Sequence, residues 1–215
     1  MPHRRIAIAL FALALLLPSA AGAMGIEKGV KAGADLSNFR GSFADLVDTK
    51  WKAGFVGGAF VAFGFAPDLA VQVEALYSMK GAKMSVQMTN SEGVPTGEFV
   101  DVFANVNYLE VPVLLRGTLL KGSPVQPMYY LGPTVAFSLG GKVESDDSRV
   151  QSEDIKDLKT VDFGLALGAG VGFKVGGQRV LTELRYTTGF TDIYDVSGNL
   201  ESINQQLALT AGIAF

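Results

Sequence analysis

Apolar and polar residues alternate with a period of two along most of the chain after residue 24. In residues 161–174, for example, Val, Phe, Leu or Ala takes every odd position, and Asp, Ala, Gly or Lys takes every even one. This period is typical of a β-strand with one apolar face. Eight such segments are recognisable, at residues 28–36, 51–65, 69–80, 106–118, 128–138, 161–174, 180–189 and 205–215. The sequence therefore predicts an all-β protein.

The connections between these segments alternate in length. Those after the second, fourth and sixth segments are short, at 66–68, 119–126 and 175–178. The others are long, at 37–50, 81–105, 139–160 and 190–204. Membrane-spanning barrels have short periplasmic turns, long extracellular loops and strands of ~9–11 residues. We therefore expect a single eight-stranded antiparallel transmembrane β-barrel with short periplasmic turns and long extracellular loops.

The last segment places Leu207, Leu209, Ala211, Ile213 and the terminal Phe215 on one apolar face. Such a strand would be a sticky edge in an open sheet, but a closed barrel pairs the last strand with the first and removes both edges. We therefore expect residues 205–215 to pair with residues 28–36. Segment 51–65 is almost entirely apolar or Gly, so its pattern does not decide which face points inward.

The composition of the two faces indicates which one contacts lipid. The less apolar face is rich in Gly, Ala and Thr and poor in charge, and it carries the run Gly168, Gly170 and Gly172. Inside a narrow barrel these glycines would make room for larger side chains, whereas on a water-facing exterior they would leave a bare stripe. The pattern favours large apolar side chains facing lipid. A secreted soluble lipid-binding barrel, with its apolar face inside, is the alternative.

The first 23 residues have the composition of a secretory signal peptide. Arg4 and Arg5 precede twelve apolar residues, and Ala21-Gly22-Ala23 provides a small-residue cleavage site. A short membrane anchor is the alternative, but the apolar run is too short to span a bilayer. The expected domains are a signal peptide at 1–23 and an outer-membrane β-barrel domain at 24–215.

The composition of the mature chain excludes several classes of protein. There is no Cys, so neither disulfides nor a lipoprotein anchor can form. Loss of residues 1–23 removes two of the 18 basic residues and no acidic one, which changes the formal charge from −3 to −5. A net negative charge argues against a nucleic-acid partner.

Six stretches of the chain resemble a known family. The stretches are GVKAGADLSNF (29–39), EALYSMKGAK (74–83), YLEVPVLLR (108–116), GPTVAFSLG (132–140), ELRYTTGFTDI (183–193) and the terminal AGIAF. In order and spacing they resemble the bacterial outer-membrane β-barrel family often labelled porin-like, and the architecture is similar to small OmpA- and OmpX-type barrels.

The resemblance implies location in the outer membrane of a Gram-negative-type bacterium. It implies contact with outer-membrane lipid and lipopolysaccharide, and delivery by periplasmic chaperones to the outer-membrane assembly machinery. The terminal strand resembles the assembly signal of such barrels, which would be carried here by Leu209, Ala211, Ile213 and Phe215.

Most charges on the predicted inward face fall on three segments. They are Glu74, Lys80, Glu110, Arg116, Glu183 and Arg185. Buried charges must be paired and hydrogen-bonded, or each costs several kcal/mol. These residues are expected to form either a packed polar plug or the lining of a narrow ion path. The plug is favoured because side chains can fill the interior of an eight-stranded barrel.

The sequence contains few residues that could support catalysis. The only His is His3, within the predicted signal peptide, and without Cys no His- or Cys-dependent nucleophilic centre can form in the mature chain. Glu74 and Glu110 could do acid–base chemistry, but ion pairing is favoured. The acidic loop at 139–160 fits no calcium-binding spacing. We expect no enzyme activity, no cofactor and no metal.

The sequence thus predicts a structural or interaction protein that displays its outer loops above a closed, charge-paired lumen. The barrel is expected to be a monomer with an extracellular partner that contacts the loops. A narrow porin-like channel for small solutes is the first alternative.

Overall fold

A computed structural model describes residues 25–90, 92, 94–147, 149, 151–155, 158–193 and 201–215. The predicted signal peptide lies outside these residues. The elements are β1 (Gly25–Arg40), α2 (Ser42–Val47), β2 (Lys52–Ala66), β3 (Leu69–Thr89), β4 (Pro95–Thr118), β5 (Val125–Ser145), β6 (Glu153–Asp154), β7 (Val161–Val175), β8 (Gln178–Gly189) and β9 (Ile203–Ala214). No helix in the described part of the chain is long and apolar enough to cross a membrane.

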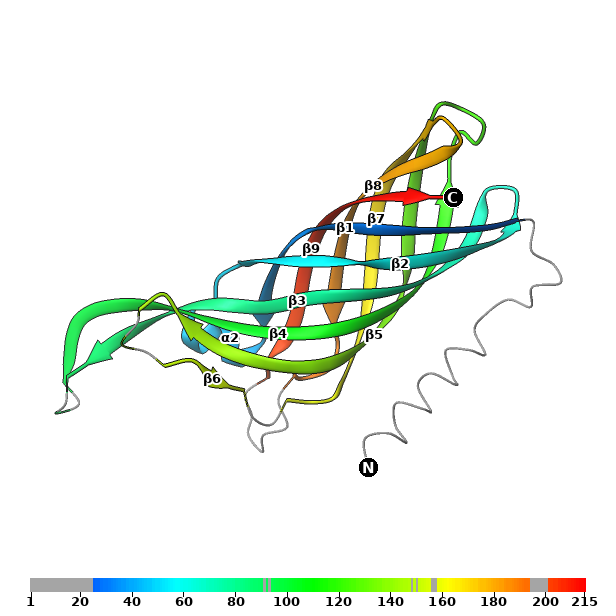
Figure 1. Ribbon diagram of the computed structural model, residues 1–215. Coiled ribbons are helices and arrows are strands. Elements are labelled where there is room, and N and C mark those ends of the chain that lie inside the picture. The colour runs from blue at the N-terminus through cyan, green and yellow to red at the C-terminus, as the bar shows by residue number, and fades with distance from the viewer. Residues whose placement is uncertain are drawn as a thin grey trace.

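Eight of the described strands form a closed ring in the order β4-β3-β2-β1-β9-β8-β7-β5, which the β4–β5 pairing completes (Figure 1). All neighbours in this ring are antiparallel. The first and last strands pair from Gly29 with Ala214 to Arg40 with Ile203. The predicted all-β barrel and its closure are therefore confirmed.

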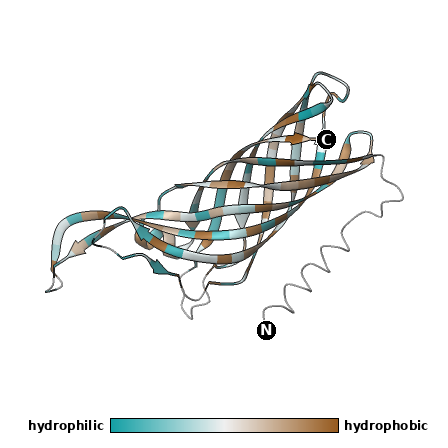
Figure 2. Ribbon diagram, in the orientation of Figure 1, coloured by the Kyte–Doolittle hydropathy of each residue, from teal (hydrophilic) through white to brown (hydrophobic). Residues whose placement is uncertain are grey.

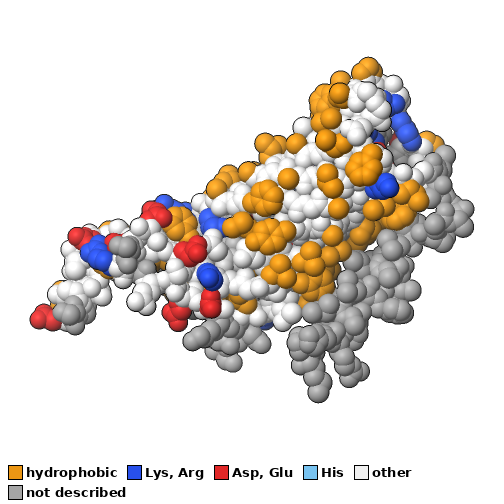
Figure 3. Space-filling model, viewed as in Figure 1, with side chains coloured by type: hydrophobic (Ala, Val, Ile, Leu, Met, Phe, Trp, Pro, Cys, Tyr) orange, Lys and Arg blue, Asp and Glu red, His pale blue; other side chains and the backbone are white. Residues whose placement is uncertain are grey.

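Side-chain exposure alternates along the strands as the pattern predicts. The apolar residues Leu109, Leu165, Leu184 and Leu209 are between 39% and 62% exposed on the outside, and Figure 2 shows the alternation along the ribbons. On the face shown in Figure 3, large apolar side chains cover the barrel body, and most of the acidic side chains visible there lie at one end. The alternative hypothesis, a lipid-binding barrel with its apolar face inside, is therefore wrong.

Strand β2, whose facing the sequence leaves open, follows the same rule. Val56 and Phe60 are buried in the lumen, at 3% and 2% exposure, whereas Phe55 and Phe65 are 47% and 44% exposed on the outside. Phe60 packs closely over Gly29 of the neighbouring strand, where an added Cβ would lie 2.6 Å from the ring. The glycine therefore provides the space that a large interior side chain needs.

The two ends of the barrel differ. At the turn end, β2–β3, β4–β5 and β7–β8 are joined by short turns, and Gly25 and Phe215 also lie there. At the loop end, β3, β4 and β5 continue beyond the barrel as an outer arm made of residues 81–89, 95–105 and 140–145 (Figure 1). The long loops predicted at 81–105 and 139–160 are thus strand over part of their length.

Two glycines with positive φ angles and a register shift mark the positions where the outer arm leaves the barrel. Gly81 and Gly140 have φ angles of +148° and +124°, a region that glycine adopts readily. The β4–β5 register shifts next to Tyr108, which marks a β-bulge. The arm is therefore a hairpin with a third strand alongside, and from Gly81 to Thr89 it extends roughly 26 Å at ~3.3 Å per residue. At the base of the arm, α2 packs Ala44 into a cluster with Phe39, Ala82 and Ala104.

Candidate functional site

The inward positions of β1 divide the lumen into layers. From the turn end to the loop end, Glu27, Lys31, Asp35 and Phe39 follow one another at intervals of four residues. At ~3.3 Å per residue, successive layers are roughly 13 Å apart along the strand. Three of the four layers carry charge, and the last is apolar.

The central layer is an ion cluster that crosses the lumen. We call Lys31, Glu74, Glu183 and Arg185 the central ion cluster. Arg185 Nη1 and Nη2 donate to Glu74 Oε2 and Oε1 at 2.7 and 2.8 Å. Lys31 Nζ donates to Glu74 Oε1 at 2.8 Å and to Glu183 Oε2 at 3.2 Å. Arg185 also pairs with Glu183. Two cations thus balance two carboxylates.

The Glu74–Arg185 pair spans the full width of the barrel. Glu74 is on β3 and Arg185 is on β8, and three strands separate these two on either side of the ring. The Glu74 side chain is completely buried, and that of Arg185 is 7% exposed. Charge-assisted, two-point contacts of this kind are among the stronger hydrogen bonds in proteins. The pair therefore ties opposite walls of the lumen together.

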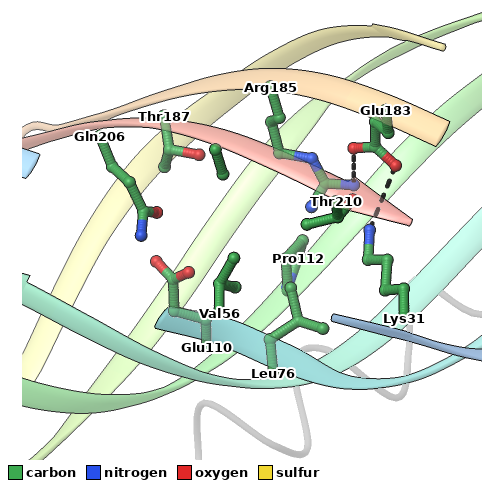
Figure 4. A pocket seen from close by; sticks show the side chains of 11 residues that line it. Lys31, Val56, Leu76, Glu110, Pro112, Glu183, Arg185, Thr187, Gln206 and Thr210 are labelled. Carbon is green, nitrogen blue, oxygen red and sulfur yellow. Dashed lines mark hydrogen bonds and ion pairs between the residues drawn. The ribbon is translucent and has the colours of Figure 1, made fainter. Parts of the chain in front are cut away.

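A small cavity lies next to the central ion cluster on its loop-end side. Thr187, Gln206 and Val56 are among the side chains that line it, together with members of the cluster (Figure 4). The cavity has a volume of about 10 Å³, counted as the space that the centre of a water molecule can occupy. This is about the room that one buried water requires.

An apolar layer lies in the lumen between the central ion cluster and the turn end. It consists of Phe60, Leu114, Met128, Tyr130, Ala166, Leu181 and Ala214. Arg185 lies over the Tyr130 ring, with 5.8 Å between the guanidinium carbon and the ring centroid. Beyond this layer, Glu27 accepts hydrogen bonds from Arg116 Nη1 at 2.5 Å and from Arg179 Nη1 at 2.6 Å.

The loop-end half of the lumen contains a second crossing. Asn204 Nδ2 donates to the Tyr108 hydroxyl at 3.1 Å and to Asp162 Oδ2 at 2.9 Å. Asn204 and Tyr108 lie on β9 and β4, which are also opposite strands of the ring. Lys80 and Glu110 pair between the neighbouring strands β3 and β4. Above them, an apolar cap consists of Phe39, Ala44, Ala82, Ala104 and Ile193.

The structure places all six predicted lumen charges inside the barrel, each at most 6% exposed: Glu74, Lys80, Glu110, Arg116, Glu183 and Arg185. It does not bring them into one network among themselves. Lys80 pairs with Glu110, and Arg116 pairs with Glu27, which the sequence analysis did not single out. What these charges do for conduction and stability stays a prediction.

The predicted set of lumen charges left out further interior charges: Glu27, Lys31, Asp35, Lys52, Asp162 and Arg179. The signal for Lys31 and Asp35 was present, because both alternate with apolar residues in segment 28–36. Glu27 and Arg179 lie just beyond the predicted strand bounds, and Lys52 lies on the strand of uncertain facing.

The four residues of the predicted assembly signal face outward near the turn end. Leu209, Ile213 and Phe215 are 62%, 43% and 61% exposed, and Ala211 is exposed beside them. Their backbone is fixed by pairing with β1 and β8. Their role in assembly stays a prediction.

The outer arm and the loop that follows β5 carry exposed ion pairs. Lys83 Nζ lies 2.6 Å from Asp101 Oδ2. Arg149 Nη2 lies 2.6 Å from Asp147 Oδ2 and 3.3 Å from Glu98 Oε2. Hydrogen bonding to the Arg149 side chain and backbone lowers the pKa of Asp147 to about 2. Among the described residues, no three acidic or His side chains are grouped to hold a metal ion.

Comparison with known proteins identifies the family. Residues 20–195 match the model of the outer membrane protein β-barrel domain. A comparison with curated protein sequences found no match.

Among solved structures, the chain is similar to the Neisserial surface protein A, with 15% identity, a TM-score of 0.49 and coverage of 90% of this chain and 97% of that one. It is similar to Ail, the attachment invasion locus protein of Yersinia pestis, with 18% identity, a TM-score of 0.43 and coverage of 89% and 100%. It is also similar to the outer membrane protein OprG of Pseudomonas aeruginosa, with 14% identity, a TM-score of 0.46 and coverage of 92% of this chain and 99% of that one.

The family match covers most of the chain, and the closed ring of eight strands with an apolar exterior agrees with it. The chain therefore belongs to the outer membrane protein β-barrel domain family and is an outer-membrane protein.

Proposed function

We propose that this protein is a closed barrel whose role is to display its outer connections, above all the outer arm, to an extracellular partner. The observation that carries the proposal is the Glu74–Arg185 pair, which joins opposite strands at 2.7 and 2.8 Å. A solute that crossed the lumen would have to separate these charges. Breaking a buried ion pair costs ~3–5 kcal/mol.

The remaining layers support a closed lumen. The apolar layer around Leu114 and Tyr130 lies below the central ion cluster, and the Asn204–Tyr108 hydrogen bond and the apolar cap lie above it. The cavity between these layers has room for about one water. A barrel filled in this way acts as a rigid support, and its specificity then resides in the residues outside the membrane.

Absence of enzymatic activity is part of the proposal. The mature chain proposed here, residues 24–215, contains neither His nor Cys. The buried carboxylates Glu74 and Glu183 are held by cations and are therefore unsuited to proton transfer. Export by a signal peptide at 1–23 and assembly through Leu209, Ala211, Ile213 and Phe215 complete the proposal. A monomer is proposed because ring closure pairs both long edges of every barrel strand within the membrane.

Planar-bilayer recording tests the closed lumen. The wild-type protein should give no conductance steps, whereas the double variant Glu74→Ala/Arg185→Ala should give brief openings because it loses the contact between opposite walls. The double variant serves as the control for insertion into the bilayer. Regular steps from the wild-type protein would instead establish the narrow channel for small solutes.

Epitope insertion tests the display of the outer arm. A short tag is inserted after Glu92, between β3 and β4, and in a matched variant after Gly177, between β7 and β8. An antibody should stain intact cells with the first tag, and should stain cells with the second only after permeabilisation. The reverse pattern would refute the proposed orientation.

A further inference from the structure

Asp35 and Lys52 are two buried charges in the loop-end half of the lumen. Asp35 is on β1, between the layers of Lys31 and Phe39, and Lys52 starts the neighbouring strand β2. They are 2% and 7% exposed. Among the described residues, neither carboxylate oxygen of Asp35 has a hydrogen-bond partner. The Nζ atom of Lys52 has none there either.

The other charged side chains of the described interior differ in this respect. Lys31, Glu74, Glu183 and Arg185 contact one another, as do Lys80 and Glu110. Several guanidinium Nε atoms are also unpartnered, but their Nη atoms form ion pairs. Asp35 and Lys52 thus stand apart because every charged atom that they have lacks a direct partner.

The surroundings of Asp35 are polar and confined. The Ser37 hydroxyl, on the same inward face, is also buried and unpartnered. The Gln206 amide interacts with Asp35 without reaching the geometry of a direct hydrogen bond, and its Nε2 also donates to Ser78 Oγ at 2.8 Å. Across the strand pair, an added Cβ on Gly54 would lie 2.8 and 3.1 Å from the two Asp35 oxygens. The carboxylate therefore packs over this glycine.

The buried charges around the two residues balance, because Asp35 and Glu110 oppose Lys52 and Lys80, whereas Glu144 is exposed. Those that act on Asp35 are Lys52, Lys80 and Glu110, and those that act on Lys52 are Asp35 and Glu144. Asp35 and Lys52 attract each other without touching. Two desolvated charges in this state would each cost several kcal/mol, and groups that donate to Asp35 and accept from Lys52 would remove most of that cost.

We propose that a cluster of ordered waters binds between Asp35, Ser37 and Lys52 and bridges the two charges. Water donates to a carboxylate and accepts from an ammonium, and it adds no charge to the buried site, whose charges already balance. Buried waters of this kind make two to four hydrogen bonds, which these unpartnered atoms can supply. The lumen then has a hydrated chamber between the apolar cap and the central ion cluster.

NMR in lipid bilayers tests the chamber directly, because Lys31 is a matched control. Both lysines are buried to a similar degree, at 6% and 7% exposure, but Lys31 is ion-paired to Glu74 and Glu183. Magnetisation transfer from water should reach the Lys52 ammonium several-fold more strongly than the Lys31 ammonium. Equal transfer to the two lysines would overturn the proposal.

A bound anion is distinguished by changing the buffer salt. The Lys52 signal should be the same in chloride, fluoride and sulfate, and a signal that follows the anion would refute water as the occupant.

Unfolding by urea gives an independent readout. Lys52→Met should lower the unfolding midpoint, since Asp35 then loses its bridged counter-charge, and Asp35→Asn/Lys52→Met should recover part of the loss. If Lys52→Met raised the urea unfolding midpoint, the Lys52 ammonium would be destabilising the fold because no water solvates it. That result would contradict the water bridge.

Discussion

Replacing Arg185 by Met measures the energetic role of the central ion cluster. Met keeps most of the side-chain volume but removes both hydrogen bonds to Glu74, at 2.7 and 2.8 Å, and the contact with Glu183. Two buried carboxylates then face one ammonium, that of Lys31. Because removal of one partner leaves an uncompensated buried charge, the variant should lose ~3–5 kcal/mol of unfolding free energy.

The control is Glu74→Gln/Arg185→Met. This variant leaves Lys31 opposite Glu183, so charge balance is kept. It should lose only about 1–2 kcal/mol, the order expected for ordinary hydrogen bonds left unmade. Fluorescence of Trp51, the single Trp of the chain, reports urea unfolding in lipid vesicles, since its side chain is 45% exposed on the barrel exterior.

Two results would refute the reasoning. A loss below ~1 kcal/mol for Arg185→Met would mean that the pair is solvated in the folded barrel. A double variant whose loss equals the sum of the losses of Glu74→Gln and Arg185→Met would mean that the two side chains do not interact.

Three further predictions concern the lipid face, the terminal strand and the loop that follows β5. Leu165→Arg, on the lipid face of β7, should cost ~2–4 kcal/mol and weaken heat-modifiable migration on gels, and unaltered migration would refute the facing. Deletion of Phe215 should lower outer-membrane levels of the protein, and unchanged levels would contradict an assembly signal. NMR titration should show Asp147 losing its charge near pH 2, and near its ordinary pKa of ~3.9 in Arg149→Ala. Since the folded pKa is depressed, any stabilisation by this pair is present above the unfolded pKa and is lost as the pH falls through about 2.

The alternation of side chains predicted the barrel because lipid and lumen impose opposite requirements on successive residues. Where both apply, as in Leu165 and Ala166, sequence and structure agree residue by residue. In the outer arm both faces of a strand lie outside the membrane, so the requirement weakens. Val86 and Phe99 are 48% and 68% exposed there. The sequence of the arm therefore resembles a loop although its backbone is paired.

The identity of the interior charges was more predictable than their partners. Inward facing follows from position along a strand, and it would have found Lys31 and Asp35 as readily as Glu74. Partners across the lumen depend on how far each strand is shifted relative to the others as the ring closes. That shift brings Arg116 to Glu27 and Arg185 to Glu74, and no local pattern encodes it.

The ion pairs across the lumen supply information that the alternation lacks. A slip of one residue between strands turns the lumen face toward lipid, so the apolar pattern alone rejects it. A slip of two residues keeps every side chain on its correct face and moves it only ~6–7 Å along the strand. Such a slip would separate Glu74 from Arg185 and leave both buried without their partners. At ~3–5 kcal/mol for a broken buried pair, we therefore expect the central ion cluster to favour one register among those that the apolar pattern permits.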